Sequence, residues 1–295
     1  MEITEGVFPA IVTPFDSDGE VDYDTLIENV ERLEDGGVDG IVPCGSTGES
    51  ATLTHEEHKD VVEAVVENAT TPVIAGTGSN STHEALDLTK HADETGADGA
   101  LLISPYYNKP NPSGLRKHYE RIADEVDIPL VLYNVPSRTG QNMPVDVVVQ
   151  LAEHPNIAAI KEASGDINQI GEICRRTRDM EFDVVSGDDA ITLPLISVGG
   201  TGVISVVGNI FPEGMNEIVQ AALDGDYEKA REVHQELLPV MDAMFLETNP
   251  IPVKKSMEIM GYCDSRLRLP LDDMSDENLE KLRRVLQSYQ AETER

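Results

Sequence analysis

Eight short apolar runs alternate with amphipathic segments from Gly6 to about Gly225. The runs are apolar on both faces, as strands are when helices cover both sides of a parallel sheet. The segments between them have helical spacing, for example at residues 25–34, 57–68 and 83–94. Eight such units over roughly 220 residues fit a closed (β/α)8 barrel, which typically takes about 250 residues. The predicted strands are GVFPAIV, GIVPCG, PVIAGT, GALLISP, PLVLYNV, IAAIKEA, FDVVSG and GVISVVG.

Local signals mark where several of these helices begin and end. Thr54 followed by Glu57 is a capping-box pattern, and Gly36–Gly37 and Gly96 stand where C-caps are expected. The alternative fold is an open doubly wound sheet, which usually has fewer units. No strand is followed by a Gly-x-Gly-x-x-Gly or Gly-Lys-Ser/Thr phosphate loop. The pattern therefore predicts an α/β fold of the TIM-barrel type without a nucleotide site.

The strand pattern stops after Gly225, and only helical spacing follows. The Pro-marked segment NPIPVK, at residues 249–254, leads into the second of the helices expected there. We therefore expect a catalytic barrel at residues 1–225 and a C-terminal helical domain at residues 226–295. The three C-terminal helices are predicted at residues 227–245, 252–260 and 276–290.

Composition favours a soluble protein of the reducing cytoplasm. No basic region precedes the first apolar run, so the opening MEITEGVFPAIV does not have the pattern of a signal peptide. The uncharged stretch at residues 190–212 contains Pro194 and several glycines, which favours a buried helix and strand over a membrane span. The three cysteines are scattered without a CxxC pair, so neither disulfides nor a zinc site is indicated.

The net charge is −33, from 55 acidic and 22 basic residues, which is extreme for 295 residues. Nucleic-acid binding is disfavoured, because so acidic a chain repels a phosphate backbone. The acidic residues are spread along the chain and form no tail, which argues against a disordered acidic segment. We expect a halophile-type surface, on which strong salt screens the self-repulsion.

Lys161 interrupts the apolar run IAAIKEAS. Burial lowers the pKa of a lysine and frees its amine to attack a carbonyl carbon. A lysine that extends from a strand end into solvent is an equally good explanation of this residue taken alone. We expect the effect of burial on its pKa to exceed that of the acidic surface, because salt screens distant charges more.

Polar side chains stand at the ends of several other predicted strands. The active site of a (β/α)8 barrel forms at the carboxyl ends of its strands, so these side chains would face one mouth. This convergence favours a functional interpretation over a core tyrosine, a surface arginine or a solvated lysine. The residues are Ser46 and Thr47 after the second strand, Tyr106 and Tyr107 after the fourth, Tyr133 and Arg138 at the fifth, Lys161 in the sixth and Gly187–Asp189 after the seventh.

Motifs distributed over nearly the whole chain resemble the family of dihydrodipicolinate synthase and N-acetylneuraminate lyase, barrel enzymes that form a Schiff base with pyruvate. The segments YYNKP and VPSRTG are similar to the synthase branch. Ser46-Thr47 departs from the Thr-Thr common in synthases but keeps the hydroxyl. The motifs are GSTGESATLTHEEH, PVIAGTGSN, SPYYNKP, YNVPSRTG, IKEASGD, SGDDA, GVISV and NPIPVK.

This resemblance implies that Lys161 condenses with pyruvate. Tyr133 would move protons through Ser46 to Tyr107, which would reach in from a neighbouring subunit. An iminium at pyruvate C2 withdraws electrons, so a methyl proton can leave and create a nucleophilic enamine. The shuttle works in both directions if the pKa of the phenol is lowered.

The resemblance also implies how the substrates are held. Thr47 and nearby backbone N–H groups would bind the pyruvate carboxylate. Arg138 would bind the carboxylate of L-aspartate 4-semialdehyde, since a guanidinium grips a carboxylate through two hydrogen bonds. Gly187 and the backbone carbonyl of Ile204 would line the pocket.

The implied reaction joins pyruvate and L-aspartate 4-semialdehyde to give 4-hydroxy-tetrahydrodipicolinate in lysine biosynthesis. It needs no metal or nucleotide, and the family implies a homotetramer built as a dimer of dimers. The main alternative is an aldolase of 2-keto-3-deoxy sugar acids, against which Arg138 and the tyrosines argue. A catalytically silent keto-acid sensor and a nucleotide-dependent oxidoreductase are further alternatives. Intact Lys161, Tyr133 and Ser46 disfavour the sensor, and the missing phosphate loop disfavours the oxidoreductase.

His55 and His58 share a helix face, but HEEH is not the HExxH zinc pattern and no third ligand is evident. The resemblance implies instead a lysine effector site at a subunit interface, with Glu84 pairing the effector ammonium. Asp188–Asp189 would either hold a cation or position backbone or substrate. The implied effector residues are Ser50, Ala51, His55, His58, Asn80, Glu84 and Tyr106.

Overall fold

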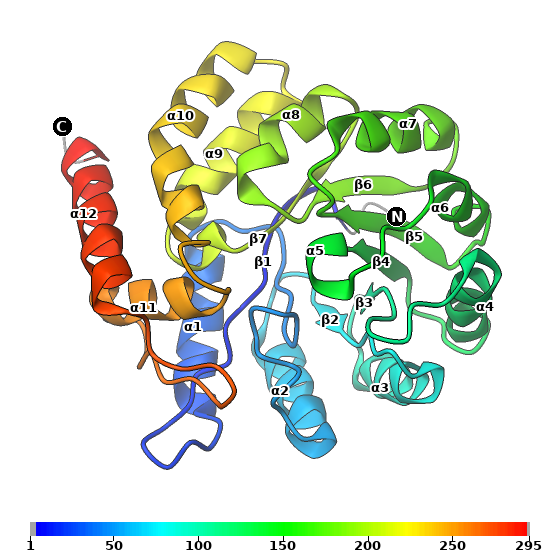
Figure 1. Cartoon of the computed structure of the whole chain (residues 1–295), viewed down its shortest axis with the longest axis horizontal. Coiled ribbons are helices and arrows are strands. Elements are labelled where there is room, and N and C mark those ends of the chain that lie inside the picture. Colours follow the sequence, from blue (N-terminus) through cyan, green and yellow to red (C-terminus); the bar gives the residue numbers. More distant parts are fainter. Residues whose placement is uncertain (1–3, 294–295) are drawn as a thin grey trace.

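The computed structural model describes residues 4–293 and shows a ring of parallel strands surrounded by helices (Figure 1). Seven strands pair in the order β1-β7-β6-β5-β4-β3-β2. The predicted second strand closes the ring between β1 and β2 through two parallel bridges, Ala10–Val42 and Ile41–Val73. It is short because Pro43 has no N–H to donate and Cys44 has a positive φ of 55°. The strands are β1 (Gly6–Pro9), β2 (Ile74–Gly76), β3 (Gly99–Ile103), β4 (Leu130–Asn134), β5 (Ile157–Glu162), β6 (Asp183–Ser186) and β7 (Gly202–Ser205).

The predicted barrel is therefore confirmed. The first three residues of the opening segment lie outside the described part. Side chains along each strand alternate between the inside of the ring and the surrounding helices. The inner set forms one apolar cluster drawn from all the strands and from the bridging segment. Its buried members are Phe8, Ala10, Val42, Ile74, Leu101, Val131, Tyr133, Val135, Ala159, Val185 and Ile204.

Each strand is followed by at least one helix, and the predicted helix signals are confirmed. Thr54 and Glu57 form the reciprocal capping box, and Gly96 ends its helix in the left-handed conformation at φ 94°. The barrel helices are α1 (Tyr23–Asp35), α2 (His55–Asn68), α3 (Thr82–Thr95), α4 (Pro112–Ala123), α5 (Pro136–Thr139), α6 (Val145–Leu151), α7 (Ile167–Thr177), α8 (Thr192–Ser197) and α9 (Pro212–Leu223), with 3₁₀ turns η1 (Asp189–Ile191) and η2 (Val207–Asn209).

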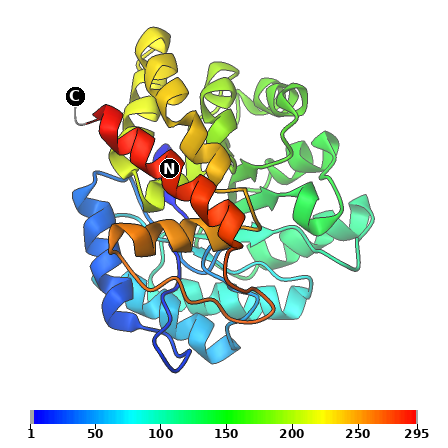
Figure 2. The same cartoon turned by 60° about the vertical axis from the view of Figure 1, so that its left-hand side comes forward.

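Three further helices lie against one side of the barrel, next to α1 and α9 (Figures 1 and 2). They are α10 (Tyr227–Ala243), α11 (Ile251–Met260) and α12 (Asp276–Thr293). The predicted division at residues 225 and 226 falls in the turn between α9 and α10. Val7 and Val203 of the barrel belong to the same buried cluster as Val240 and Met257 of α10 and α11. The barrel and the C-terminal helices thus share one buried core. Their division into two domains stays a prediction.

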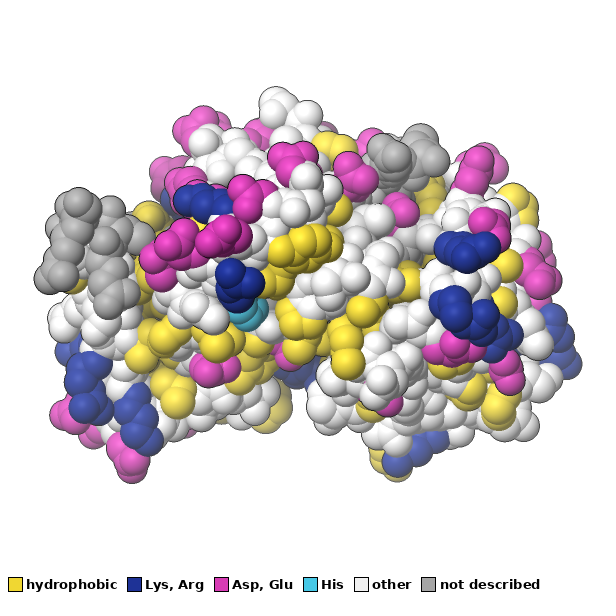
Figure 3. Space-filling view, turned by 90° about the horizontal axis from the view of Figure 1, so that it is seen from above, with side chains coloured by type: hydrophobic (Ala, Val, Ile, Leu, Met, Phe, Trp, Pro, Cys, Tyr) yellow, Lys and Arg dark blue, Asp and Glu magenta, His cyan; other side chains and the backbone are white. Residues whose placement is uncertain are grey.

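Acidic side chains form several groups over the face seen in Figure 3, with Lys and Arg side chains among them. This distribution agrees with an acidic excess that is spread along the chain. Residues 190–212 form α8, β7, η2 and the start of α9, as the prediction of a buried helix and strand requires. Within residues 4–293, no helix combines the length and apolar character needed to span a bilayer.

Candidate active site

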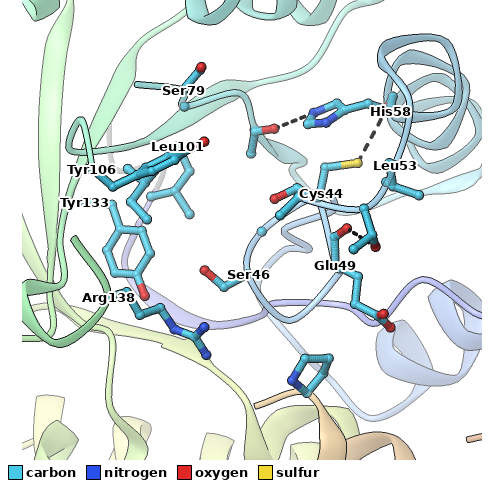
Figure 4. Close-up of a pocket in the computed structure, with 18 of the residues that line it drawn as sticks. Cys44, Ser46, Glu49, Leu53, His58, Ser79, Leu101, Tyr106, Tyr133 and Arg138 are labelled. Carbon is cyan, nitrogen blue, oxygen red and sulfur yellow. Dashed lines mark hydrogen bonds between the residues drawn. The ribbon is translucent and has the colours of Figure 1, made fainter. Parts of the chain in front are cut away.

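A cavity of about 420 Å³ opens at the carboxyl ends of the strands. Ser46, Tyr133, Arg138 and Lys161 line it, as the strand-end argument predicts. Figure 4 shows the side chains of Ser46, Tyr133 and Arg138 converging on the same space from different segments. Segments distant in the sequence thus bring a lysine, a phenol, a hydroxyl and a guanidinium together.

Lys161 lies near the end of β5 and is only 5% exposed. Burial lowers the pKa of its ammonium to about 7. Buried Asp189 opposes this shift and the positive charge of Arg138 adds to it. The expectation that burial would outweigh the acidic surface is therefore confirmed. A substantial fraction of the amine is unprotonated near neutral pH, as attack on a carbonyl requires.

Tyr133 is the strand partner of Lys161 in the pairing of β4 with β5. Its ring centroid lies 4.5 Å from the Lys161 Nζ. Burial raises the pKa of the Tyr133 phenol to about 12, although Arg138 and a hydrogen bond with Ser46 act in the opposite direction. A proton shuttle needs a phenol with a lowered pKa. In this single chain the pKa of Tyr133 is raised instead, because the effect of burial exceeds that of both favourable contacts.

Asn249 connects two further residues of the predicted site. Its Nδ2 donates to the Thr47 Oγ1 at 2.9 Å, and its carbonyl accepts from the Arg138 guanidinium at 2.9 Å. Thr47 is 2% exposed and stands behind the cavity wall. The hydroxyl and the guanidinium are thus held by the same residue, which comes from the segment between α10 and α11.

Gly187 and Ile204, which were predicted to line the pocket, lie next to Lys161 and Tyr133 but do not contribute to the lining of the cavity, and neither does Asp189. A Cβ at Gly187 would lie 2.9 Å from the Lys161 Cε, so only glycine leaves room for that side chain. Ile204 belongs to the inner cluster with Tyr133. The Asp189 carboxylate accepts from the Ser205 hydroxyl and from the N–H groups of Val206 and Val207. Of the two predicted uses of Asp188–Asp189, Asp189 therefore positions backbone.

A buried ion pair ties the loop of Ser46 to the C-terminal helices. The Lys254 Nζ lies 2.6 Å from the Glu49 carboxylate, and both side chains are fully buried. Glu49 has a positive φ of 53°, which non-glycine residues rarely adopt. Such strained backbone persists where its surroundings over-determine it. We call Asn249 and Lys254, with their contacts to Thr47, Arg138 and Glu49, the C-terminal clamp.

The predicted relay residue Tyr107 is not brought into the site of its own chain. Its side chain is 90% exposed, its φ is 67°, and it does not contribute to the lining of the cavity. The neighbouring Tyr106 does line the cavity. This placement leaves the relay from Tyr133 and Ser46 without its third hydroxyl within one chain.

The predicted effector residues lie beside the active site, in the same cavity. His58 is buried, its Nε2 lies 2.7 Å from the Gly76 carbonyl, and burial lowers its pKa to about 4 (Figure 4). Glu84 accepts a hydrogen bond from the Ser79 hydroxyl. Asn80 alone of the set is not part of the lining. The effector residues that line the cavity are Ser50, Ala51, His55, His58, Glu84 and Tyr106.

No group of three or more His, Cys, Asp or Glu side chains among the described residues has the arrangement of a metal site. The contacts of Asn249 with Thr47 and of Lys254 with Glu49 could not be predicted from the sequence, although Asn249 and Lys254 belong to the motif NPIPVK. Asn249 lies 202 residues from Thr47, and nothing local in the sequence indicates that the two meet. Glu49 lies two residues after Thr47, within the motif GSTGES, and this position was the available signal for its importance.

The pattern that defines the dihydrodipicolinate synthetase family matches residues 3–289. The 4-hydroxy-tetrahydrodipicolinate synthase of Haloarcula marismortui is 58% identical over 288 residues, covering 97% of this chain and 94% of that protein. The synthase of Methanosarcina acetivorans is 58% identical over 278 residues, covering 94% and 96% of the two chains.

Solved structures agree with these relatives. Dihydrodipicolinate synthase from Aquifex aeolicus is 49% identical with a TM-score of 0.94, covering 97% of this chain and 98% of that one. The enzyme from Acinetobacter baumannii, complexed with pyruvate, is 42% identical with a TM-score of 0.94 and coverage of 97% and 98%. The enzyme from Cyanidioschyzon merolae, with lysine bound, is 39% identical with a TM-score of 0.94 and coverage of 98% and 99%.

Proposed function

The chain belongs to the dihydrodipicolinate synthetase family, and we propose from this membership and from its site that Lys161 is the amine that reacts with pyruvate. Its activity is that of a 4-hydroxy-tetrahydrodipicolinate synthase in lysine biosynthesis. The family uses a Schiff base between pyruvate and a lysine and needs no cofactor. The relatives described above are synthases, which favours this reaction over the aldolase alternative.

The proposed steps assign one task to each group. The unprotonated Lys161 amine attacks C2 of pyruvate. The former carbonyl oxygen takes one proton from the amine and one from the Tyr133–Ser46 hydroxyls and leaves as water, giving the iminium. The Tyr133–Ser46 pair, now one proton short, then accepts a proton from the methyl carbon, giving the enamine. The enamine carbon attacks the aldehyde carbon of L-aspartate 4-semialdehyde, whose carboxylate Arg138 holds. Thr47, Gly187 and Ile204 are proposed to bind and enclose pyruvate.

The observation that carries this proposal is a buried lysine, with a pKa of about 7, beside a buried phenol in a cavity. The test is borohydride reduction with pyruvate, followed by peptide mass analysis. We expect the reduced adduct on the peptide that contains Lys161. Lys161→Ala should form none, whereas Lys229→Ala, at an exposed lysine of α10, should form as much as the natural chain. An adduct on another lysine contradicts the assignment.

We also propose that Tyr107 completes the relay in a neighbouring subunit, within a homotetramer built as a dimer of dimers. Tyr107 is exposed and does not line the cavity of its own chain, which supports a contribution to another chain. Tyr107→Phe and Tyr133→Phe should each be inactive. Mixing the two denatured and refolded variants should restore part of the activity, because some sites then combine both natural tyrosines. A mixture that stays inactive contradicts this arrangement, and light scattering measures the oligomer.

Lysine is the proposed effector, and the lysine-bound relative from Cyanidioschyzon merolae supports this proposal. Glu84 is the proposed partner of the effector ammonium, because its acidic side chain lines the cavity. His58 lines the same cavity, and its low pKa keeps it neutral, so it does not repel a cation there. Initial rates should fall across millimolar lysine, and Glu84→Gln should weaken the inhibition while leaving the uninhibited rate near its natural value. Rates that do not respond to lysine dispose of this proposal.

A cytoplasmic location is proposed as well. Cys44, Cys174 and Cys263 are all free, as is usual for proteins of reducing compartments. Cell fractionation, with detection of the protein in the cytosolic fraction, tests the location directly.

A further inference from the structure

The pairing of β4 with β5 places Tyr133 opposite Lys161 and Asn134 opposite Glu162. The register of these two strands shifts between Leu130 and Val131, near the beginning of β4. Pairing at the amino ends of the two strands therefore does not by itself set which residues meet at their carboxyl ends. A slip of one residue would also turn every side chain to the opposite face.

Asn134 and Glu162 face away from the cavity and are both fully buried. The Asn134 Nδ2 donates to the Glu162 Oε1 at 2.6 Å, directly between the paired positions. The same amide group donates to the Asn142 Oδ1 at 2.7 Å, and its Oδ1 accepts from the Met143 N–H at 3.0 Å. Every polar atom of the Asn134 side chain is thus in use.

Glu162 is satisfied just as fully. Its carboxylate also accepts from the N–H and the hydroxyl of Ser164, at 3.2 and 3.3 Å, and from the Gln169 Nε2 at 3.4 Å. These donors are all neutral, so the buried carboxyl has hydrogen bonds without an ion pair among them. A buried polar network is costly unless every member is paired, and a fully paired one holds a single arrangement.

We infer that the Asn134–Glu162 hydrogen bond is a register lock, which keeps Tyr133 and Lys161 opposite each other at the end of β4 and β5. Asn134 and Glu162 are then positioning residues that act through the backbone one residue away from the reacting groups. The inference rests on the proposed roles of Lys161 and Tyr133. A misplacement of about 1 Å costs on the order of 100-fold in rate.

The lock can be tested by exchanging its donor and acceptor. Asn134→Asp places a second carboxylate against Glu162, and we expect imine formation at saturating pyruvate to slow by at least about tenfold. Glu162→Gln keeps an acceptor towards Asn134 and should stay within about threefold of the natural rate. The double variant Asn134→Asp with Glu162→Gln restores a donor–acceptor pair in the reverse direction, so it should recover most of the lost rate.

Asn156→Ala is the matched control. Asn156 lies directly before β5, at the opposite end of the strand from Lys161, and its Nδ2 donates to the carbonyls of Ala123 and Val126 at 3.3 and 2.8 Å. This variant should melt at a lower temperature but form the imine at the natural rate per folded molecule. A merely structural role for Asn134 would give the same result, with the melting temperature changed and the rate constant unchanged.

Two outcomes overturn the lock: a natural rate in folded Asn134→Asp, or a double variant that recovers neither folding nor rate. The proposed function fails differently. In that case the natural chain forms no reducible adduct at Lys161, whatever the variants do.

Discussion

Burial gives Lys161 and Tyr133 opposite shifts in pKa, because it disfavours whichever form carries the charge. The lysine loses its proton more easily, with a pKa of about 7, and the phenol keeps its proton, with a pKa of about 12. In one chain the pair is therefore ready for the first step, attack by an amine. Giving up the phenol proton is harder for Tyr133, which is consistent with a relay completed by another subunit.

The pH dependence of imine formation should report the pKa of Lys161. The reactive form is the free amine, so the rate should rise as pH increases through about 7 and level off above it. An ordinary lysine would continue to gain reactivity up to a pH of about 10.4. Stopped-flow mixing with pyruvate across this range measures the profile, and a rate still rising above pH 9 contradicts the buried-amine account.

Arg138→Met should move that profile in a known direction. The Arg138 charge helps to lower the pKa of Lys161, so its removal should shift the midpoint of the profile to higher pH. Semialdehyde binding should weaken in the same variant, which raises its KM. An unshifted midpoint would mean that burial alone accounts for the lysine.

Gly187→Ala should slow imine formation by about 10- to 100-fold. The new methyl carbon would lie 2.9 Å from the Lys161 Cε and 2.8 Å from the Ala163 Cβ, so the lysine must move. Overpacking of this kind also costs about 1–3 kcal/mol in the free energy of unfolding. Gly171→Ala in α7 is the control, since the nearest atom there, the Val198 Cβ, is 3.9 Å away. Borohydride trapping at short times compares the two, and equal rates refute the steric argument.

At the scale of elements, the strands and most helices follow from the sequence, because each is encoded by a local period and local caps. The Thr54–Glu57 box and the Gly96 cap are examples, each set within a few residues. The edge of the barrel at which the site lies also follows, since parallel strands end at one edge. The C-terminal clamp does not follow, because Lys254 and Glu49 meet through the packing of the whole chain.

Lys254→Met should destabilise the protein by about 3–5 kcal/mol, because Glu49 is then a buried carboxylate without its cation. Adding Glu49→Gln removes the stranded charge and should recover more than half of that loss. Lys229→Ala, which breaks an exposed pair with Glu217, should cost no more than about 1 kcal/mol. Urea unfolding at constant high salt gives all three values, and equal losses for the buried and exposed pairs contradict the clamp.

For the whole molecule, the charge of −33 sets the conditions under which the barrel is stable. Thirteen ion pairs between Lys or Arg and Asp or Glu are present among the described residues, and most are exposed and therefore weak. We therefore predict that salt stabilises the protein by reducing the repulsion among the many remaining carboxylates.

Stability should therefore fall on desalting. The screening length shrinks from about 10 Å at 0.1 M salt to about 3 Å at 1 M, so the melting temperature should rise by at least roughly 10 °C between these concentrations. A triple variant, Glu63→Gln, Glu67→Gln and Glu94→Gln, removes exposed charges from α2 and α3 and should show a smaller rise. Sucrose at equal osmolality controls for solute exclusion, which acts without screening. Calorimetry in KCl and in sucrose separates the two effects, and a cooperative melt at one unchanged temperature in dilute buffer and in 1 M KCl would refute the screening argument.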